Sequence, residues 1–332
     1  MKVHIYLLLI AAILSGCGRS DGQQQVRRQM HTAKRAMYHW KNTFNPSEEE
    51  LRFMQEHKIE RLYVRFDDVS VCSMLDEEDR QQVCPSATVQ FKSNVFANDY
   101  PNEIVPTVFI EPEAIAAIHN NGQSRTIARK MVDRILNICS YYEIPSEKVA
   151  ELQLDCDWTT STEKPFFDFC KDVRLVMPDS MLLSSTIRLH QLHRPAPPVD
   201  YGVLMLYNTN NLRDPSIENS ILSANDVKPY LRNVSYDLPL DLAYPIYAWN
   251  LWFSNGTFRG ILRSASQADS LRQAGEKIRH EEVSFDEILN VKRLVEKHLP
   301  KPSHERSTIL YHLDKDNIKR YSSHEIETLY SH

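Results

Sequence analysis

The chain has 332 residues, of which 42% are hydrophobic and 25% are charged, and its formal net charge is −5. No block of basic residues stands out, so we expect no nucleic-acid partner. The sequence has 8 glycines, and none forms a G-x-G-x-x-G or Walker-type loop, which argues against a nucleotide-binding fold. It also lacks a G-x-S-x-G turn, which disfavours a serine hydrolase.

Residues 1–17 have the pattern of a secretory signal. Lys2 supplies a positive start, Ile5–Leu14 is an apolar run, and Leu14-Ser15-Gly16-Cys17 closes the segment. The run is too short to span a bilayer comfortably. A cysteine directly after Leu-Ser-Gly resembles the lipobox of bacterial lipoproteins, in which the cysteine is lipidated and becomes the mature N-terminus. The alternative is an ordinary signal peptide with an incidental Cys17.

The next segment, residues 18–34, is rich in Gln, Arg, Ser and Gly. It has little apolar surface to bury, so we interpret it as a flexible tether. The resemblance to lipoproteins implies a chain held in the cell envelope by a lipid on Cys17. We expect residues 35–332 to form a single domain, as a monomer.

Strand-like and helix-like segments alternate along that domain. We expect eight strands at residues 36–44, 61–69, 104–110, 149–158, 181–189, 201–207, 242–253 and 307–313. Alternation of the two types argues for a parallel sheet. Eight strands over about 300 residues fit a (β/α)₈ TIM-type barrel of the α/β class better than an open sheet. Residues 255–282 fit neither pattern and predict an insertion between the last two strands.

The expected helices cover residues 47–58, 124–142, 165–177, 284–299 and 322–330, with a short helical turn at 226–231. Ser47 and Glu50 have the spacing of a capping box at the start of the first helix. In the second helix, Ile127, Met131, Ile135 and Ile138 lie on one face, as in an amphipathic helix.

The cysteines other than Cys17 carry less information. Cys72 and Cys84 flank a polar stretch and are candidates for a disulfide in an oxidising compartment. We interpret Cys139, Cys156 and Cys170 as small buried hydrophobic residues rather than a metal site. No C-x-x-C pair exists in the sequence.

The fourth expected strand carries the strongest functional pattern. Alternation along Glu151–Thr159 puts Leu152, Leu154 and Cys156 on one face, and Gln153, Asp155 and Asp157 on the other. Active sites of such barrels lie at the carboxyl ends of the strands. Two neighbouring carboxylates there repel each other, so their pKa values separate and one can stay protonated as an acid. The structural alternative is a helix N-cap or a loop ion pair.

Other strand ends are also polar or aromatic. Candidate ligand-binding residues at these ends are Arg65, Asp67, Arg188, His190, Tyr207, Asn208, Tyr247, Trp249 and Asn250, and Glu111 is a further candidate acid. Aromatic faces stack on sugar rings, while carboxylates and amides bind hydroxyl groups or move protons. The pattern therefore predicts a carbohydrate site.

Several of these side chains have alternatives. Arg65 is as well explained by an ion pair with Asp67 or Asp157 inside the barrel. Trp40 and Trp252 fit the core as well as a binding platform. His190 and His193 have H-x-x-H spacing, but that spacing splits them between the faces of a strand, so we expect no metal ion and no cofactor.

The segment Leu152–Thr159 resembles the fourth strand of chitinase-like glycoside hydrolases of family 18, which carries D-x-x-D-x-D-x-E. Asp155 and Asp157 match the second and third Asp, Leu152 takes the place of the first, and Thr159 takes the place of the Glu that is the family's general acid. The whole chain also resembles a group of bacterial lipoproteins of predicted barrel fold that share this type of strand.

The sequence therefore predicts a membrane-anchored, glycoside-hydrolase-like barrel that acts on a carbohydrate, with Asp155 and Asp157 at its centre. Because Thr159 cannot serve as an acid, Asp157 or Glu111 would have to do so. Two alternatives remain: a lipoprotein that binds a glycan without cleaving it, and a metal-dependent hydrolase that uses His190 with the two aspartates.

Overall fold

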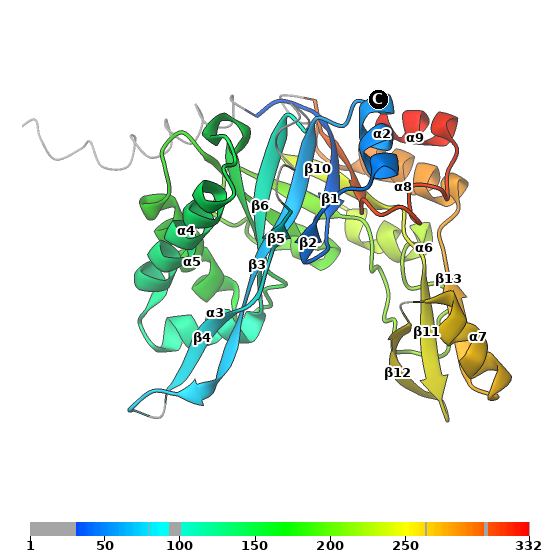
Figure 1. The fold of residues 1–332 in the computed structure, drawn as a ribbon, viewed down its shortest axis with the longest axis horizontal. Helices are drawn as coiled ribbons and strands as arrows, with labels where there is room; N and C mark the ends of the chain where they lie inside the picture. Colours follow the sequence, from blue (N-terminus) through cyan, green and yellow to red (C-terminus); the bar gives the residue numbers. More distant parts are fainter. Residues whose placement is uncertain (1–30, 79, 93–100, 263, 302–304, 332) are drawn as a thin grey trace, which may run out of the picture.

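A closed barrel of eight parallel strands forms the centre of the molecule (Figure 1). The computed structural model describes residues 31–78, 80–92, 101–262, 264–301 and 305–331. In sheet order, the strands are β1 (Arg35–His39), β14 (Thr308–Tyr311), β10 (Leu240–Pro245), β9 (Tyr201–Met205), β8 (Leu182–Ile187), β7 (Glu151–Asp155), β6 (Glu103–Ile110) and β3 (Arg61–Leu75). β1 pairs with both β14 and β3, which closes the sheet and confirms the predicted (β/α)₈ barrel.

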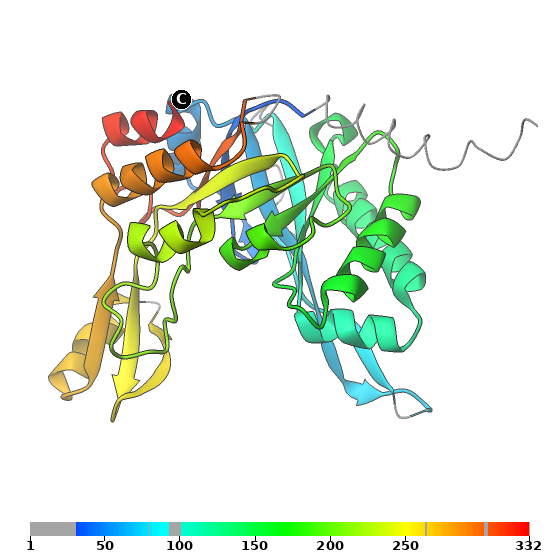
Figure 2. The ribbon, with the colours of Figure 1, turned by 180° about the vertical axis from the view of Figure 1, so that it is seen from behind.

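Helices follow most strands and cover the outside of the barrel (Figures 1 and 2). They are α2 (Glu48–Glu56), α3 (Pro112–Asn120), α4 (Ser124–Tyr141), α5 (Glu163–Val176), α6 (Ala224–Val227), α8 (Phe285–His298) and α9 (Ser323–Tyr330), with 3₁₀ turns η1 (Ser146–Lys148), η2 (Leu189–His193) and η3 (Lys228–Leu231). Ser47 and Glu50 form the predicted capping box of α2. Within the described residues, no helix is long and apolar enough to cross a membrane.

The inside of the barrel is polar and aromatic, whereas its outside is apolar. Tyr38 donates a hydrogen bond of 2.8 Å from its hydroxyl to Gln153, and the Gln153 amide reaches Ser184 at 3.3 Å. On the other face of β7, Leu152 and Leu154 are fully or almost fully buried in the hydrophobic core. Gln153 and its β7 neighbours therefore point as the period-two pattern predicts.

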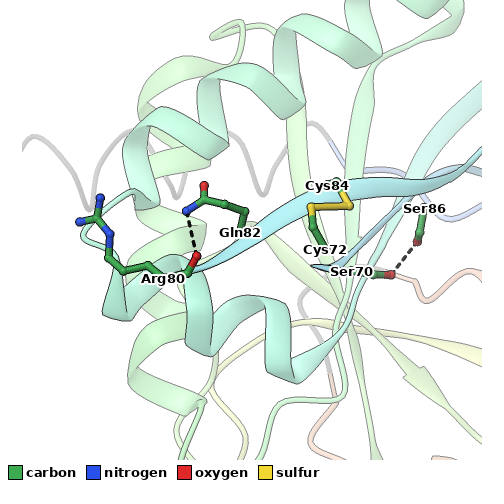
Figure 3. The surroundings of a disulfide bond; sticks show 6 residues. All are labelled: Ser70, Cys72, Arg80, Gln82, Cys84 and Ser86. Carbon is green, nitrogen blue, oxygen red and sulfur yellow. Dashed lines mark hydrogen bonds between the residues drawn. A yellow bond between two sulfur atoms is a disulfide. The ribbon is translucent and has the colours of Figure 1, made fainter. Parts of the chain in front are cut away.

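Two arms extend from the carboxyl end of the barrel on opposite sides (Figures 1 and 2). The first arm is β3, which continues to Leu75 and pairs with the antiparallel strand β4 (Gln81–Thr88). Cys72 and Cys84 join these strands in a disulfide with a Cα–Cα distance of 5.6 Å (Figure 3). The three other cysteines of the described chain are buried. Beside the root of the arm, β2 (Thr43–Phe44) pairs with β5 (Gln90–Phe91).

The second arm corrects the prediction of one strand over residues 242–253. Only β10 belongs to the barrel, whereas β11 (Trp249–Ser254) pairs with β12 (Thr257–Leu262) and β13 (Lys277–Glu281) in a separate antiparallel sheet beside α7 (Ala265–Gln273). The insertion therefore begins at Trp249 rather than at residue 255. A continuous apolar run does not reveal that its two halves pair with different sheets.

The amino end of the barrel is closed by residues that the sequence placed in the tether. His31 is 6% exposed, stacks on Tyr201 at 3.9 Å and lies 3.0 Å from the Asp241 carboxylate. Lys34 is paired with Glu103. Residues 31–34 thus pack on the first residues of barrel strands, while residues 1–30, including Cys17, lie outside the described part of the chain.

Candidate functional site

Two adjoining cavities open at the carboxyl ends of the barrel strands. The aromatic compartment, of about 250 Å³, is lined by Tyr38, Trp40, Arg65, Phe109, Asp155, Thr186, Arg188, Met205, Tyr207, Asn208 and Tyr311. The polar compartment, of about 200 Å³, is lined by Asp157, Arg188, Leu189, His190, Met205, Tyr207, Asn208, Thr209 and Tyr230. The two share four residues, so they form one continuous site at the place where such barrels carry their chemistry.

Aromatic rings form much of the first compartment. Tyr207 stacks on Tyr311 with ring centroids 4.5 Å apart, and the Tyr38 ring lies 5.6 Å from that of Tyr311. Trp40 closes the group, with its ring 5.9 Å from Tyr38. Tyr38 and Tyr311 belong to β1 and β14, while Trp40 and Tyr207 follow the ends of β1 and β9. Such flat apolar faces beside polar groups are suited to sugar rings.

Asp155 lies at the base of the site and is almost completely buried. Its Oδ1 accepts a 2.6 Å hydrogen bond from Thr186 and lies 3.5 Å from Nη2 of Arg188. Burial raises the pKa of the Asp155 carboxyl, although Arg188 partly opposes this. Asp155 therefore takes up a proton more readily than an exposed aspartate.

Asp157 differs from Asp155 because its side chain is 53% exposed. Its Oδ1 lies 3.5 Å from Nε of the same Arg188. The two carboxylates thus lie at the same distance from one guanidinium. Arg188 is held in place from its own backbone: its N–H donates to Gln191 at 2.8 Å, and the Gln191 amide donates to the Trp158 carbonyl at 2.9 Å.

Arg65 enters the aromatic compartment, but its partner is neither of the predicted ones. Its Nε donates to Asp68 at 2.7 Å, its Nη2 contacts the other oxygen of that carboxylate, and the guanidinium lies over Trp40 at 5.4 Å. Asp67 points away from the site, where it accepts hydrogen bonds from Thr88 at 2.8 Å and Arg134 at 2.9 Å.

A β-bulge explains this exchange of faces. Arg65 pairs with Thr107, but the next pairing joins Asp67 to Val108, so Phe66 is an extra residue in β3. The extra residue reverses the side-chain alternation that follows it. Asp67 was expected beside Arg65 at the mouth, and the bulge places Asp68 there instead.

The remaining predicted residues lie at different distances from the cavities. Tyr247 borders the site, because its hydroxyl donates to Asn208 at 2.6 Å, and Trp249 packs behind it at 5.2 Å. Asn250 belongs to β11 and accepts a hydrogen bond from Arg272 of α7 at 3.3 Å, so the structure does not bring it to the cavities. Glu111 is the N-cap residue of α3 and lines neither compartment.

The metal alternative required His190 and two carboxylates to converge. His190 lines the polar compartment beside Asp157, while Nε2 of His193 donates to the Tyr230 carbonyl oxygen at 3.0 Å. In the part of the chain that the structure describes, no group of three His, Cys, Asp or Glu side chains is arranged to hold a metal ion.

Sequence reasoning missed several residues of the site. Tyr38, Phe109, Thr186, Met205 and Tyr311 line the aromatic compartment but were not proposed, and Trp40 was left undecided between core and site. The period-two alternation that found Asp155 also marks Tyr38 and Tyr311. These two side chains lie within β1 and β14, whereas most of the predicted residues lie at or after the ends of strands.

Thr159, which takes the place of the general acid of family 18 glycoside hydrolases, belongs to the loop before α5. Its backbone N–H donates to Thr162 at 2.9 Å, and its hydroxyl lies 3.0 Å from that of Ser161. The side chain thus takes part in a local turn. A threonine hydroxyl does not act as a general acid at neutral pH, because its proton is bound too tightly.

No family model and no curated protein matches the sequence. Solved structures match the fold. The spore cortex-lytic enzyme SleL of Bacillus cereus matches with a TM-score of 0.52 and 12% identity, covering 90% of this chain and 74% of that one. A GH18 chitinase from Cycas revoluta in complex with (GlcNAc)3 has a TM-score of 0.52 and 13% identity, covering 90% and 100%.

A chitinase from Bacteroides thetaiotaomicron has a TM-score of 0.53 and 11% identity, covering 90% of this chain and 97% of that one. At identities this low, the likeness concerns the fold. The chain has a (β/α)₈ barrel of the kind found in family 18 glycoside hydrolases.

Proposed function

We propose that this chain is a carbohydrate-binding protein of the cell envelope, which holds a glycan in the barrel mouth without hydrolysing it. The observation that carries the proposal is the site itself: an aromatic compartment with Tyr207 and Tyr311 beside the carboxylate and amide groups of Asp155 and Asn208. Stacking and hydrogen bonding of this kind are how proteins bind sugars. The barrels that resemble it include a chitinase that holds (GlcNAc)3.

The charges of the site favour binding over hydrolysis. Glycoside hydrolysis uses an acid at the leaving oxygen and a second carboxylate, or a group of the substrate, at the anomeric carbon. Here Asp155 and Asp157 both lie 3.5 Å from the guanidinium of Arg188, and Thr159 supplies no acid. Glu111 lies outside both compartments.

A hydrolase is the second candidate, and one observation favours it. Burial raises the pKa of Asp155, so this carboxyl takes up a proton more readily than an exposed aspartate does. A carboxyl of this kind beside a second carboxylate is a common arrangement for acid catalysis. In that case Asp155 would be the acid at the leaving oxygen, and Asp157, whose side chain is 53% exposed, would be the second carboxylate.

The place of the protein in the cell is part of the same proposal. A lipid on Cys17 would hold the chain at a membrane, and the Cys72–Cys84 disulfide supports an oxidising compartment outside the cytoplasm. Residues 31–34 pack at the amino end of the barrel, opposite to the mouth. A tether that joins there would leave the glycan site facing away from the membrane.

The experiment is a binding and hydrolysis screen of the full chain in detergent against oligosaccharides, run beside Trp40→Ala and Asp157→Asn. We expect binding without release of product, and binding weakened about tenfold or more in Trp40→Ala, because ring stacking is lost. Product formation that disappears in Asp157→Asn would establish the hydrolase instead. Absence of both binding and cleavage would contradict the carbohydrate proposal.

The anchor is tested separately with Cys17→Ser in a bacterial host. We expect the unaltered chain to fractionate with membranes and to take up labelled fatty acid, and the variant to do neither. Membrane association that persists in Cys17→Ser would show that Cys17 is not the anchor.

A further inference from the structure

The sizes of the two compartments indicate a ligand that spans both. Each holds about 200–250 Å³, whereas pockets for whole small-molecule ligands measure roughly 300–1,000 Å³. The compartments share Arg188, Met205, Tyr207 and Asn208, so a ligand that occupies both passes directly over Arg188. In the function proposed above, on which this inference rests, the ligand is then a glycan of at least two units.

The two arginines of the site differ in how closely their guanidinium groups are bonded to carboxylates. The Arg65 fork is occupied by Asp68, with one hydrogen bond at 2.7 Å and a second contact to the other carboxylate oxygen. Arg188 reaches Asp155 and Asp157 only at 3.5 Å each, whereas charge-assisted hydrogen bonds measure about 2.7–2.9 Å. Its Nε has no hydrogen-bond partner among the described residues, although it is buried.

The surroundings of Arg188 offer further donors. The Tyr207 hydroxyl is buried, and among the residues that the structure describes it has no hydrogen-bond partner. Tyr207 lines both compartments, and His190 and Thr209 line the polar one. Nε of Arg188 and the hydroxyl of Tyr207 are therefore donors that lack an acceptor at the junction of the two cavities, whereas Nη1 of Arg188 contacts the Met205 sulfur, which is a weak acceptor. Buried donors in this state favour a ligand that supplies oxygen acceptors.

We propose that the glycan carries a carboxylate on the unit in the polar compartment, and that Arg188 binds this carboxylate through its guanidinium fork. A planar guanidinium matches the two oxygens of a carboxylate, whereas a sugar hydroxyl fills only one donor position. Asp157 does not block this exchange, because its half-exposed side chain can turn to water when the ligand takes its place. Arg188 is thus the residue that determines specificity for an acidic sugar.

The test uses pairs of oligosaccharides in which one hexose is replaced by the corresponding hexuronic acid. Calorimetric titration of the full chain in detergent gives a Kd for each member. We expect the acidic member to bind about tenfold to a hundredfold more tightly, as for hydrogen bonds to a charged group. Arg188→Gln should bind both members equally. Arg188→Lys, which keeps the charge but not the fork, should retain a smaller preference.

Trp40→Ala is the matched control, since it alters the aromatic compartment only and should weaken both members by the same factor. Thermal unfolding of each variant shows whether it is folded. If Arg188→Gln does not fold, Arg188→Lys still tests the proposal. If the unaltered chain binds the neutral member as tightly as the acidic one or more tightly, the proposal that the glycan carries a carboxylate is overturned, while the proposal of carbohydrate binding stands. If neither member of any pair binds, the acidic unit and the proposed function fail together.

Discussion

The two ends of the barrel contain the same kinds of polar side chain, but these are hydrogen-bonded and ion-paired at the amino end and largely unpaired at the carboxyl end. At the amino end, Arg61 donates to Glu103 at 2.8 Å and lies 3.7 Å from Glu151, which also accepts from the Tyr201 hydroxyl. At the carboxyl end, Arg188 has its carboxylate neighbours only at 3.5 Å.

The hydroxyl groups differ in the same way. The Tyr201 hydroxyl has partners, whereas the Tyr207 hydroxyl has no hydrogen-bond partner in the described residues. Residue type therefore does not separate a stabilising cluster from a binding site in this barrel. What separates the two is whether the buried polar groups have hydrogen-bond partners, because buried groups without partners favour a ligand.

The largest expected effect is at the amino end. Arg61→Met should lower the free energy of unfolding by about 3–5 kcal/mol, because Glu151 would stay buried without its positive partner. Lys164→Met, which removes an exposed ion pair with Asp168, should cost less than about 1 kcal/mol. Denaturant titration measures both. A small effect of Arg61→Met would mean that the amino end is no more rigidly paired than the mouth.

The next effect is a dependence of stability on pH, and it comes from the buried residue His39 of β1. Burial first, and then Lys41 and His312, lower the pKa of His39 from 6.5 to about 4. The unfolded chain then takes up this proton before the folded one, so stability is lost as pH falls from about 6.5 to 4. The loss amounts to at most about 3 kcal/mol.

His39→Phe should flatten this part of the curve of unfolding free energy against pH. Some slope should remain, because burial also lowers the pKa of His312. His324→Gln, on the surface of α9, is the matched control. An unchanged slope in His39→Phe would show that His39 does not stay neutral in the folded protein.

A smaller effect is expected in the first arm. Replacing Cys72 and Cys84 together by serine should lower the free energy of unfolding by about 2–3 kcal/mol, as for a disulfide that closes a short loop. Glycan affinity should stay the same, since neither cysteine lines a compartment. Thermal unfolding with and without a reducing agent measures the effect, and reduction should not change the double variant. A loss of affinity would mean that the arm belongs to the site.

The smallest effect on stability comes from a matched pair of tyrosines and compares the two ends directly. Tyr201→Phe should cost about 1.5–3 kcal/mol, because a hydrogen bond to the Glu151 carboxylate is lost. Tyr207→Phe should leave stability unchanged or raise it by up to about 1 kcal/mol, because the removed hydroxyl has no partner in the described chain.

Only Tyr207→Phe should weaken glycan binding, by about tenfold. Unfolding curves and calorimetric titration of both variants separate the outcomes. Equal losses of stability in the two variants would contradict the conclusion that polar groups are paired at the amino end and unpaired at the mouth.

Much of the fold was already determined by the sequence. Alternation of strand and helix patterns predicted the barrel, and the period of two along β7 placed Gln153 and Asp155 inside it. The capping box at Ser47 located the start of α2. These features depend on neighbours along the chain, so local patterns record them.

The tertiary structure decided the make-up of the site. The bulge at Phe66 exchanged Asp67 for Asp68, and the pairing of β11 with β13 removed Asn250 from the mouth. The state of Arg188, with carboxylates near it but not bonded to it, also appears only in space. Each of these depends on strands that are distant in sequence, and no local pattern reports which partner a side chain will meet or at what distance.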